Sequence, residues 1–188
     1  MILVIVESPA KCSKIQSYLG DNYVVQASNG HFRQLKSLKD IDNDFNIEFS
    51  VSKEKLKYLK PLEKAVKRAK EIIIATDDDR EGHAIGWHIC QYFHLPIEST
   101  KRIIFNEISE QAIKQAIENP TTLDMHAVKA QHARQILDLT IGFRISPLLW
   151  KYVNRNANLS CGRVQSPALK IIYENQIEYN QQKPEFYY

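Results

Sequence analysis

The sequence predicts an α/β fold, in which a mostly parallel sheet is flanked by helices and followed by part of an all-helical domain. Over residues 1–118, short apolar stretches of strand length alternate with amphipathic stretches of helical period. The strand candidates are continuous apolar runs, which is typical of parallel strands covered on both faces. After Asn119-Pro120-Thr121-Thr122 only helical patterns remain. We therefore expect one domain over residues 1–120 and a second, partial domain over residues 121–188.

Composition restricts the class of protein. A chain of 188 residues with 44% hydrophobic residues can bury one full core, or one domain plus part of another. No apolar run approaches membrane length, and the N-terminus begins with a strand candidate rather than a signal-peptide pattern. Cys12, Cys90 and Cys161 are far apart and form no CxxC pair, which argues against a zinc site or a disulfide framework. We expect a protein of a reducing compartment that is neither secreted nor bound in a membrane.

The net charge of +3 is modest, but it is unevenly placed. Residues 1–118 contain 17 basic and 17 acidic side chains, whereas residues 119–188 contain 8 and 5. The excess therefore lies in the last third of the chain, where a polyanion could be held.

The first elements follow from local signals. Residues 2–6 form an apolar strand, and Ser8 and Pro9 are the expected N-cap and first residue of a helix that reaches about Leu19. A second strand is expected over residues 22–27. The later expectations are a short strand near 45–51, a helix to about Lys70 that Pro61 starts or kinks, a strand over 72–75, a helix over 82–93, a strand over 102–105 and a helix from Ser109 to Glu118.

An acidic stretch follows the strand at 72–75. Asp77, Asp78, Asp79 and Glu81 fall within five residues, where ligand sites of α/β sheets lie. An extended backbone points Asp77 and Asp79 the same way, and Glu81 can join them from the first helical turn. Oxygen ligands at this spacing suit Mg²⁺. The alternative is a solvated acidic turn that caps a helix, but four like charges raise one another's pKa.

Residues near the first two strands could bind phosphate or nucleic acid. Glu7 stands at the end of the first strand, and Lys11 lies in the first turn of the next helix, where free backbone N–H groups can also hold a phosphate. A cation there is unfavourable for the helix itself, so a purely structural Lys11 is the weaker interpretation. His31 and Arg33 lie in a loop after the second strand, although surface His and Arg residues are common.

The helical part contains a second polar group. Gln131, Arg134 and Asp138 share one face of a helix expected from about Asp124 to Ile141, and the last two are spaced for an ion pair. The alternative is an ordinary surface pair. Pro147 is expected to end this helix or its continuation. Residues 159–166 lead into a last helix, with Arg163 and Gln165 near its N-terminus. Its expected inward side chains are Val164, Ala168, Ile171 and Ile172.

Five motifs occur in the order seen in type IA DNA topoisomerases. They are VIVESPAK at 4–11, GHFR at 30–33, ATDDDREG at 75–82, SPLLW at 146–150 and GRVQS at 162–166. The first three resemble the Toprim domain, which these enzymes share with bacterial primases and some nucleases. GRVQS after a helix that carries Gln-x-Ala-Arg is specific to the topoisomerases, and the resemblance covers essentially the whole chain.

The resemblance implies roles for particular residues. Asp77, Asp79 and Glu81 match the acidic Mg²⁺ ligands of the family, and Glu7 matches an acid that assists cleavage and can join them. Lys11 and Arg134 match groups that stabilise the scissile phosphate. The positions that match contacts to single-stranded DNA, or that support them, are His31, Arg33, Gln131, Gln135, Asp138, Arg144, Lys151, Gly162, Arg163, Val164, Gln165 and Ser166.

The reaction that the resemblance implies is a transesterification. A tyrosine attacks a phosphodiester, leaving a 5′-phosphotyrosine link and a free 3′-OH, and the broken strand is resealed after strand passage. The covalent bond conserves the energy, so no ATP is needed. The implied partners are single-stranded DNA and the remaining C-terminal domains of the same protein. We expect a monomer in the cytoplasm or wherever its DNA lies.

The sequence also departs from the family pattern. His83 stands where many members carry Glu, Gln34 where many carry Asp, and Gln135 replaces a commonly basic residue. None of the nine tyrosines precedes Arg-Thr or Arg-Ser, the context of the family's nucleophile, and Tyr187 and Tyr188 follow a Pro-Glu-Phe stretch typical of a next domain. We expect an N-terminal portion that is inactive alone. The alternatives are a Toprim primase or nuclease fragment and a non-catalytic nucleic-acid-binding module.

Overall fold

A central sheet of four parallel strands forms the core of the fold, and the strands lie in the order β2-β1-β5-β6. The structure is a computed structural model that describes residues 1–155 and 158–182. Val4 in the central strand β1 lies opposite Val25 of β2 and Ile73 of β5. The strands are β1 (Ile2–Val6), β2 (Tyr23–Ala27), β5 (Glu71–Ala75) and β6 (Lys101–Arg102). The predicted α/β class and parallel sheet are therefore confirmed.

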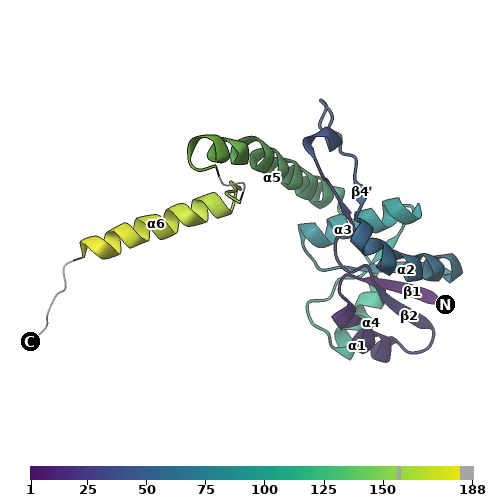
Figure 1. Cartoon of the computed structure of the whole chain (residues 1–188). Coiled ribbons are helices and arrows are strands. Elements are labelled where there is room, and N and C mark those ends of the chain that lie inside the picture. Colours follow the sequence, from purple (N-terminus) through teal and green to yellow (C-terminus); the bar gives the residue numbers. More distant parts are fainter. Residues whose placement is uncertain (156–157, 183–188) are drawn as a thin grey trace, which may run out of the picture.

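Helices cover both faces of this sheet (Figure 1). Leu3, Ile5 and Ile74 point into one buried cluster, whereas their neighbours Val4 and Ile73 point into another. The first cluster is closed by α2 (Leu56–Arg68) and α3 (Arg80–Phe93), and the second by α1 (Pro9–Leu19) and α4 (Glu110–Glu118). Burial of both faces explains why the strands are continuous apolar runs.

The connections change direction at β1. The chain passes through α1 to β2 on one side of β1, and later returns through α2 to β5 on the other side. The carboxyl ends of β1 and β5 are therefore neighbours at the point where the strand order reverses, which is where open α/β sheets hold their ligands. Glu7 follows the first of these strands, and Asp77 closely follows the second.

The connection between β2 and α2 is less regular than predicted. It contains a small antiparallel pair, β3 (Arg33–Gln34) and β4 (Ser50–Val51), and two short 3₁₀ helices, Leu38–Asp40 and Lys53–Lys55. The strand expected near 45–51 forms only at its last two residues. The Asp42 carboxylate accepts hydrogen bonds from the backbone N–H groups of Asp44 and Asn46, and this turn replaces the strand.

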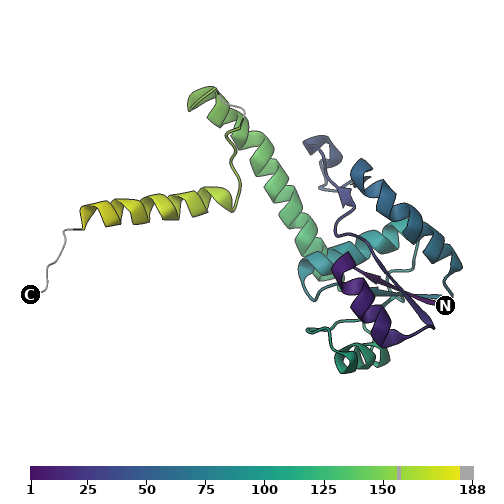
Figure 2. The ribbon, with the colours of Figure 1, turned by 60° about the horizontal axis from the view of Figure 1, so that its bottom comes forward.

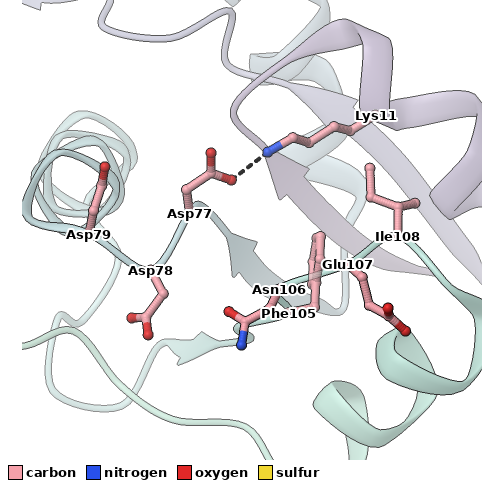
Figure 3. Close-up of a pocket in the computed structure, with 8 residues that line it drawn as sticks. All are labelled: Lys11, Asp77, Asp78, Asp79, Phe105, Asn106, Glu107 and Ile108. Atoms are coloured by element: carbon pink, nitrogen blue, oxygen red, sulfur yellow. Dashed lines mark hydrogen bonds and ion pairs between the residues drawn. The ribbon is translucent and has the colours of Figure 1, made fainter.

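The strand expected over 102–105 is also shorter than predicted. β6 ends at Arg102, although the Ile103 N–H still donates to the Ile74 carbonyl at 2.8 Å. Arg102 also exchanges two backbone hydrogen bonds with Thr121, at 2.8 and 2.7 Å. The residues after Ile103 turn away toward the carboxyl edge of the sheet, where Phe105 lines a cavity (Figure 3).

Helix α5 (Met125–Tyr152) extends from the α/β domain, and helix α6 (Gln165–Gln181) follows near its far end (Figures 1 and 2). The prediction that Pro147 ends the first of them was wrong, since α5 continues for five residues beyond it. The Trp150 indole N–H donates to the Leu159 carbonyl at 2.6 Å, and the Ser146 hydroxyl accepts from the Cys161 N–H at 3.0 Å. These contacts tie the last turns of α5 to the following segment and offset the missing proline N–H.

The apolar side chains of α6 are not buried as predicted. Ile171 and Ile172 are each 66% exposed, and Val164 is 63% exposed. The helical period was predicted correctly, but periodicity alone does not say which partner covers a face. None of the helices that the structure describes combines the length and apolar composition that a membrane-spanning segment needs.

Candidate functional site

The acidic residues form a closed loop between β5 and α3. The Thr76 hydroxyl donates to the Gly82 carbonyl at 2.8 Å, and the Gly82 N–H donates to the Asp79 carboxylate at 2.6 Å. Asp79 is therefore the N-cap of α3, and Glu81 lies in its first turn. The carboxylates of Asp77 and Asp79 point to one side of the loop and that of Asp78 to the other (Figure 3). This arrangement agrees with the two-residue period expected of an extended backbone.

The carbonyl oxygen of Asp77 fixes the position of this loop. The guanidinium of Arg102 donates to it at 2.7 Å, although the Arg102 side chain is completely buried. A Cβ atom on Gly82 would lie 2.0 Å from the same oxygen, so only glycine allows α3 to approach the strand end. Arg102 also lies 3.7 Å from the Asp78 carboxylate.

Sequence reasoning missed Arg102 as a site residue. The only signal in the sequence was a single arginine at the start of the apolar stretch Arg102-Ile103-Ile104-Phe105, because its place beside the acidic loop depends on the strand order. Burial of the guanidinium lowers the pKa of Arg102, and the nearby Asp78 carboxylate opposes this effect.

Lys11 and Glu7 flank the acidic loop. The ammonium of Lys11 makes an ion pair with the Asp77 carboxylate (Figure 3). Burial raises the pKa of Glu7, and the negative charges of Asp77, Glu81 and Asp79 raise it further, whereas Lys11 lowers it. The structure therefore brings together the ends of β1 and β5 and the first turn of α1, as the strand order requires. Ser8 occupies the predicted N-cap position, but its side chain makes no capping hydrogen bond.

The donor set fits Mg²⁺ by its chemistry. Within residues 1–155 and 158–182, no three His, Cys, Asp or Glu side chains are grouped as a metal site. Asp77 is paired with Lys11, Glu81 with His31 at 3.0 Å, and Asp79 with a backbone N–H. Two of these partners are the Lys11 ammonium and the His31 imidazole, which a divalent ion could replace. The four predicted metal ligands remain a prediction.

An open cavity of about 450 Å³ lies beside the acidic loop (Figure 3). Lys11 and three aspartates line one part of this cavity, and the segment that follows β6 lines the other. The lining residues are Lys11, Asp77, Asp78, Asp79, Phe105, Asn106, Glu107 and Ile108. The last four were not predicted, because their place at this edge depends on where β6 ends.

A second cavity, of about 400 Å³, lies between the loop after β2 and helix α5. It brings together four of the predicted DNA-contacting residues, His31, Arg33, Gln135 and Asp138. Arg33 is also a packing residue, since its guanidinium lies 5.7 and 5.8 Å from the ring centroids of Phe49 and Trp87. Gln131, another predicted contact, is buried rather than exposed to this cavity.

Asp138 also borders a third cavity, of about 500 Å³, along the last turns of α5. Its carboxylate lies 3.7 Å from the Arg134 guanidinium, so the predicted ion pair is confirmed. Arg163 is closer, at 2.9 Å, and this second pair was not predicted. The other lining residues are Leu139, Gly142, Phe143, Ser146, Pro147, Trp150, Leu159, Ser160 and Cys161.

The segment before α6 is held by its own polar side chains. Gln165 donates to the Ser160 hydroxyl at 2.9 Å, and the Ser166 hydroxyl accepts from the Gly162 N–H at 3.3 Å. Val164 is exposed beside them. Arg144 and Lys151 are exposed on α5 but line none of the three cavities, and the Lys151 ammonium lies 4.9 Å from the centroid of the Tyr152 ring.

Histidines connect the acidic loop to α5. His83 accepts a hydrogen bond from the Asp124 N–H at 3.1 Å and lies 4.0 Å from the Asp78 carboxylate. His88 is completely buried among aromatic rings, and burial lowers its pKa to about 2. The two histidines therefore have separate surroundings and do not share a metal site within the described residues.

Comparisons with known proteins show the family of both parts of the chain. Residues 2–108 match the family model of the Toprim domain, and residues 122–188 match the family model described as DNA topoisomerase. The structure is similar to that of full-length topoisomerase I from Thermotoga maritima, with 42% sequence identity and a TM-score of 0.84. The match covers 97% of this chain and 31% of the Thermotoga chain, so this chain spans about a third of that relative's length.

Proposed function

Because the chain belongs to the type IA DNA topoisomerases, we propose that it forms the metal-binding and DNA-binding portion of an enzyme that cleaves, passes and reseals single strands without ATP. The observation that carries this proposal is the junction of Glu7, Lys11 and the 77–81 loop at the strand-order reversal, beside cavities that continue along α5. The predicted Tyr187 and Tyr188 context lies outside the described residues.

Each charged residue at the junction has a proposed role. Lys11 at the junction, together with Arg134 from α5, binds and orients the scissile phosphate through charge-assisted hydrogen bonds. Glu7, whose raised pKa favours the protonated form, gives a proton to the leaving 3′-oxygen and recovers it on resealing. Asp77, Asp79 and Glu81 would hold Mg²⁺, and Glu7 would join them only in its ionised form. When bound, the ion neutralises phosphate charge.

The single strand is proposed to follow the cavities along α5. His31, Arg33, Gln135 and Asp138 line the first, and the ion pairs of Asp138 position Arg134 and Arg163 for phosphate contacts. Arg144, Lys151 and the 162–166 segment extend the path.

The two proposed domains meet near residue 120. The topoisomerase match over residues 122–188 favours this function over a primase or nuclease that shares only the Toprim part.

Isothermal titration with Mg²⁺ tests the proposed metal site. Asp77→Asn with Asp79→Asn should weaken or abolish binding, because two carboxylate ligands are lost. Asp21→Asn with Asp44→Asn, two exposed residues outside the loop, is the control with the same change of charge and should bind like the parent. Identical isotherms for the parent and the Asp77, Asp79 variant would exclude this metal site.

Fluorescence anisotropy with a single-stranded oligonucleotide tests the proposed DNA path. Neutralising Arg134, Arg144 and Arg163 together should reduce the salt dependence of binding by up to about 0.7 per lost phosphate contact. An unchanged slope would show that these arginines are only a solvated face.

A further inference from the structure

Helix α2 and the residues next to it are strongly basic, although residues 1–118 as a whole contain equal numbers of basic and acidic side chains. Between residues 53 and 70 the chain has eight basic residues but only two acidic ones, Glu54 and Glu63. The basic residues are Lys53, Lys55, Lys57, Lys60, Lys64, Lys67, Arg68 and Lys70. None of the residues already placed in the metal or DNA site belongs to this segment.

Four of these lysines form a row on one face of α2. Lys57, Lys60, Lys64 and Lys67 follow one another at intervals of three, four and three residues, which places them on one side of a helix. All four are exposed, and in the part of the chain that the structure describes none of them makes an ion pair. We call these four residues the lysine row.

The other residues of α2 do not neutralise the positive charge of the lysine row. Leu59, Leu62 and Ala65 are buried in the core, so α2 cannot turn its basic face inward. Glu63 accepts a hydrogen bond from the Tyr92 hydroxyl at 2.8 Å. Like charges three or four residues apart destabilise a helix by themselves. A bound polyanion would remove this repulsion.

The position of α2 connects the lysine row to the functional site. The Lys55 ammonium donates to the Asn29 carbonyl at 2.7 Å, two residues before His31, so α2 begins at the carboxyl edge of the sheet. It ends at the opposite edge, where the Lys70 N–H donates to the Met1 carbonyl at 3.0 Å. In Figure 1 α2 lies beside α3 and runs toward the N-terminus. The row therefore leads away from the site over about 15 Å.

We propose that the lysine row binds the phosphate backbone of double-stranded DNA next to the single-stranded segment held at the site. This inference rests on the proposed function. Duplex DNA carries one charge per about 1.7 Å of axis, so about nine phosphates lie along the row and about four of them face it. Single-strand sites usually add aromatic rings for base stacking. Tyr58 is the only exposed aromatic residue of α2, and Lys57 lies over its ring at 4.8 Å.

Anisotropy titrations with two DNA probes test this surface, one a single strand and the other the same strand with a duplex extension. The test variant carries Lys57→Gln, Lys60→Gln, Lys64→Gln and Lys67→Gln. Its control replaces four exposed lysines on other elements, with the same loss of charge. They are Lys14, Lys39, Lys101 and Lys114. A third variant changes the lysine row to arginine, which keeps its charge, and circular dichroism verifies that each variant is folded.

The parent should bind the extended probe more tightly than the single strand, and the glutamine variant should lose this difference. Its salt slope on the extended probe should fall by about 3 to 4, since each phosphate contact contributes about 0.9. The control and the arginine variant should behave like the parent. An equal loss in the control, or an equal loss on both probes, would overturn the proposal. Failure of the parent to bind the single strand would instead contradict the proposed function.

Discussion

At the scale of single residues, one carbonyl oxygen organises the candidate site. The Asp77 oxygen receives the buried guanidinium of Arg102 and lies against the Cα of Gly82. The side chain of Asp77 can therefore face the cavity while its backbone is fixed from two sides. Two substitutions test these contacts separately.

Gly82→Ala should destabilise the protein by about 3 kcal/mol, because the new methyl group meets backbone that cannot move away cheaply. Gly142→Ala is the matched control. A Cβ there would lie 3.9 Å from its nearest neighbour, and alanine favours a helix by about 1 kcal/mol. Urea denaturation of both variants and the parent measures the difference. Equal stabilities for the two variants would contradict the close packing at Gly82.

Arg102→Met should lower the affinity for Mg²⁺ by about tenfold or more, because groups that orient metal ligands contribute about this much. The apolar side chain retains most of the buried volume, so the fold should remain. Titration calorimetry measures the affinity, and Lys101→Gln, an exposed neighbour in β6, serves as the control. If Arg102→Met folds and binds Mg²⁺ like the parent, Arg102 only fills the core.

The polar residues of the site were predictable to different degrees. Glu7, Lys11 and the acidic loop could be predicted because each follows an apolar strand, and parallel strands end at one edge. Arg102 could not, because a charged residue in a strand is normally exposed and its burial depends on partners far along the chain. The approach of Arg163 to Asp138 likewise depends on how the segment before α6 folds back onto α5.

At the scale of elements, α3 and α5 pack through aromatic and imidazole rings. The His132 centroid of α5 lies 4.7 Å from that of Trp87 in α3. Phe49, which precedes β4, lies between the helices, with its ring centroid 4.5 Å from that of His88 and 5.1 Å from that of His132. Both imidazoles have a lowered pKa, chiefly because of burial and next because of the charge of Arg33. This contact joins the α/β domain to the helix that carries the proposed DNA path.

The buried His88 makes this contact sensitive to acid. Its pKa of about 2 lies below the ordinary 6.5, so its contribution to stability is complete above pH 6.5 and is lost as the pH falls below it. The loss should approach about 1.4 kcal/mol per pH unit. His88→Phe should reduce this dependence, measured by urea denaturation between pH 7.5 and 5. His126→Gln, an exposed position, is the control. If the free energy of unfolding of His88→Phe depends on pH as strongly as that of the parent, the acid sensitivity does not come from His88.

The existence and type of most helices and strands were predicted correctly, whereas several of their end points were not. The ranges expected for β1, α1 and α4 agree with the structure, because caps, prolines and apolar runs are local signals. The prediction from Pro147 was wrong because it counted only the local cost of proline in a helix, whereas hydrogen bonds with Leu159 and Cys161 offset part of that cost. The exposed face of α6 could not be predicted, since its period specifies an apolar side but no partner.

At the scale of the whole molecule, the described part carries the proposed phosphate site but none of the residues proposed for it is an attacking tyrosine. The proposed reaction needs an attacking tyrosine, and none of the nine tyrosines has the Arg-Thr or Arg-Ser context of the family. Charge at the site lowers the barrier for attack but cannot supply the attacking oxygen.

The 188-residue chain alone should therefore neither relax supercoiled plasmid nor become covalently linked to DNA. Denaturing gels after incubation with labelled single-stranded DNA and Mg²⁺ measure the linkage, with a full-length type IA topoisomerase as the positive control. A covalent adduct on this chain would mean that one of its own tyrosines is the nucleophile, and would contradict the prediction.

The hydrogen bond between His83 and the Asp124 N–H has a mechanical consequence. It attaches the first turn of α3, next to the acidic loop, to the N-cap of α5, and this helix of 28 residues is about 42 Å long. A tilt of about 5° at that attachment moves the Tyr152 end by about 4 Å, which is more than a hydrogen bond's length. Because α5 also packs on α3 through His132 and Trp87, a tilt of α5 must carry α3 and the adjoining carboxylates with it. A small rotation at the acidic loop therefore becomes a displacement of about 4 Å where α5 ends.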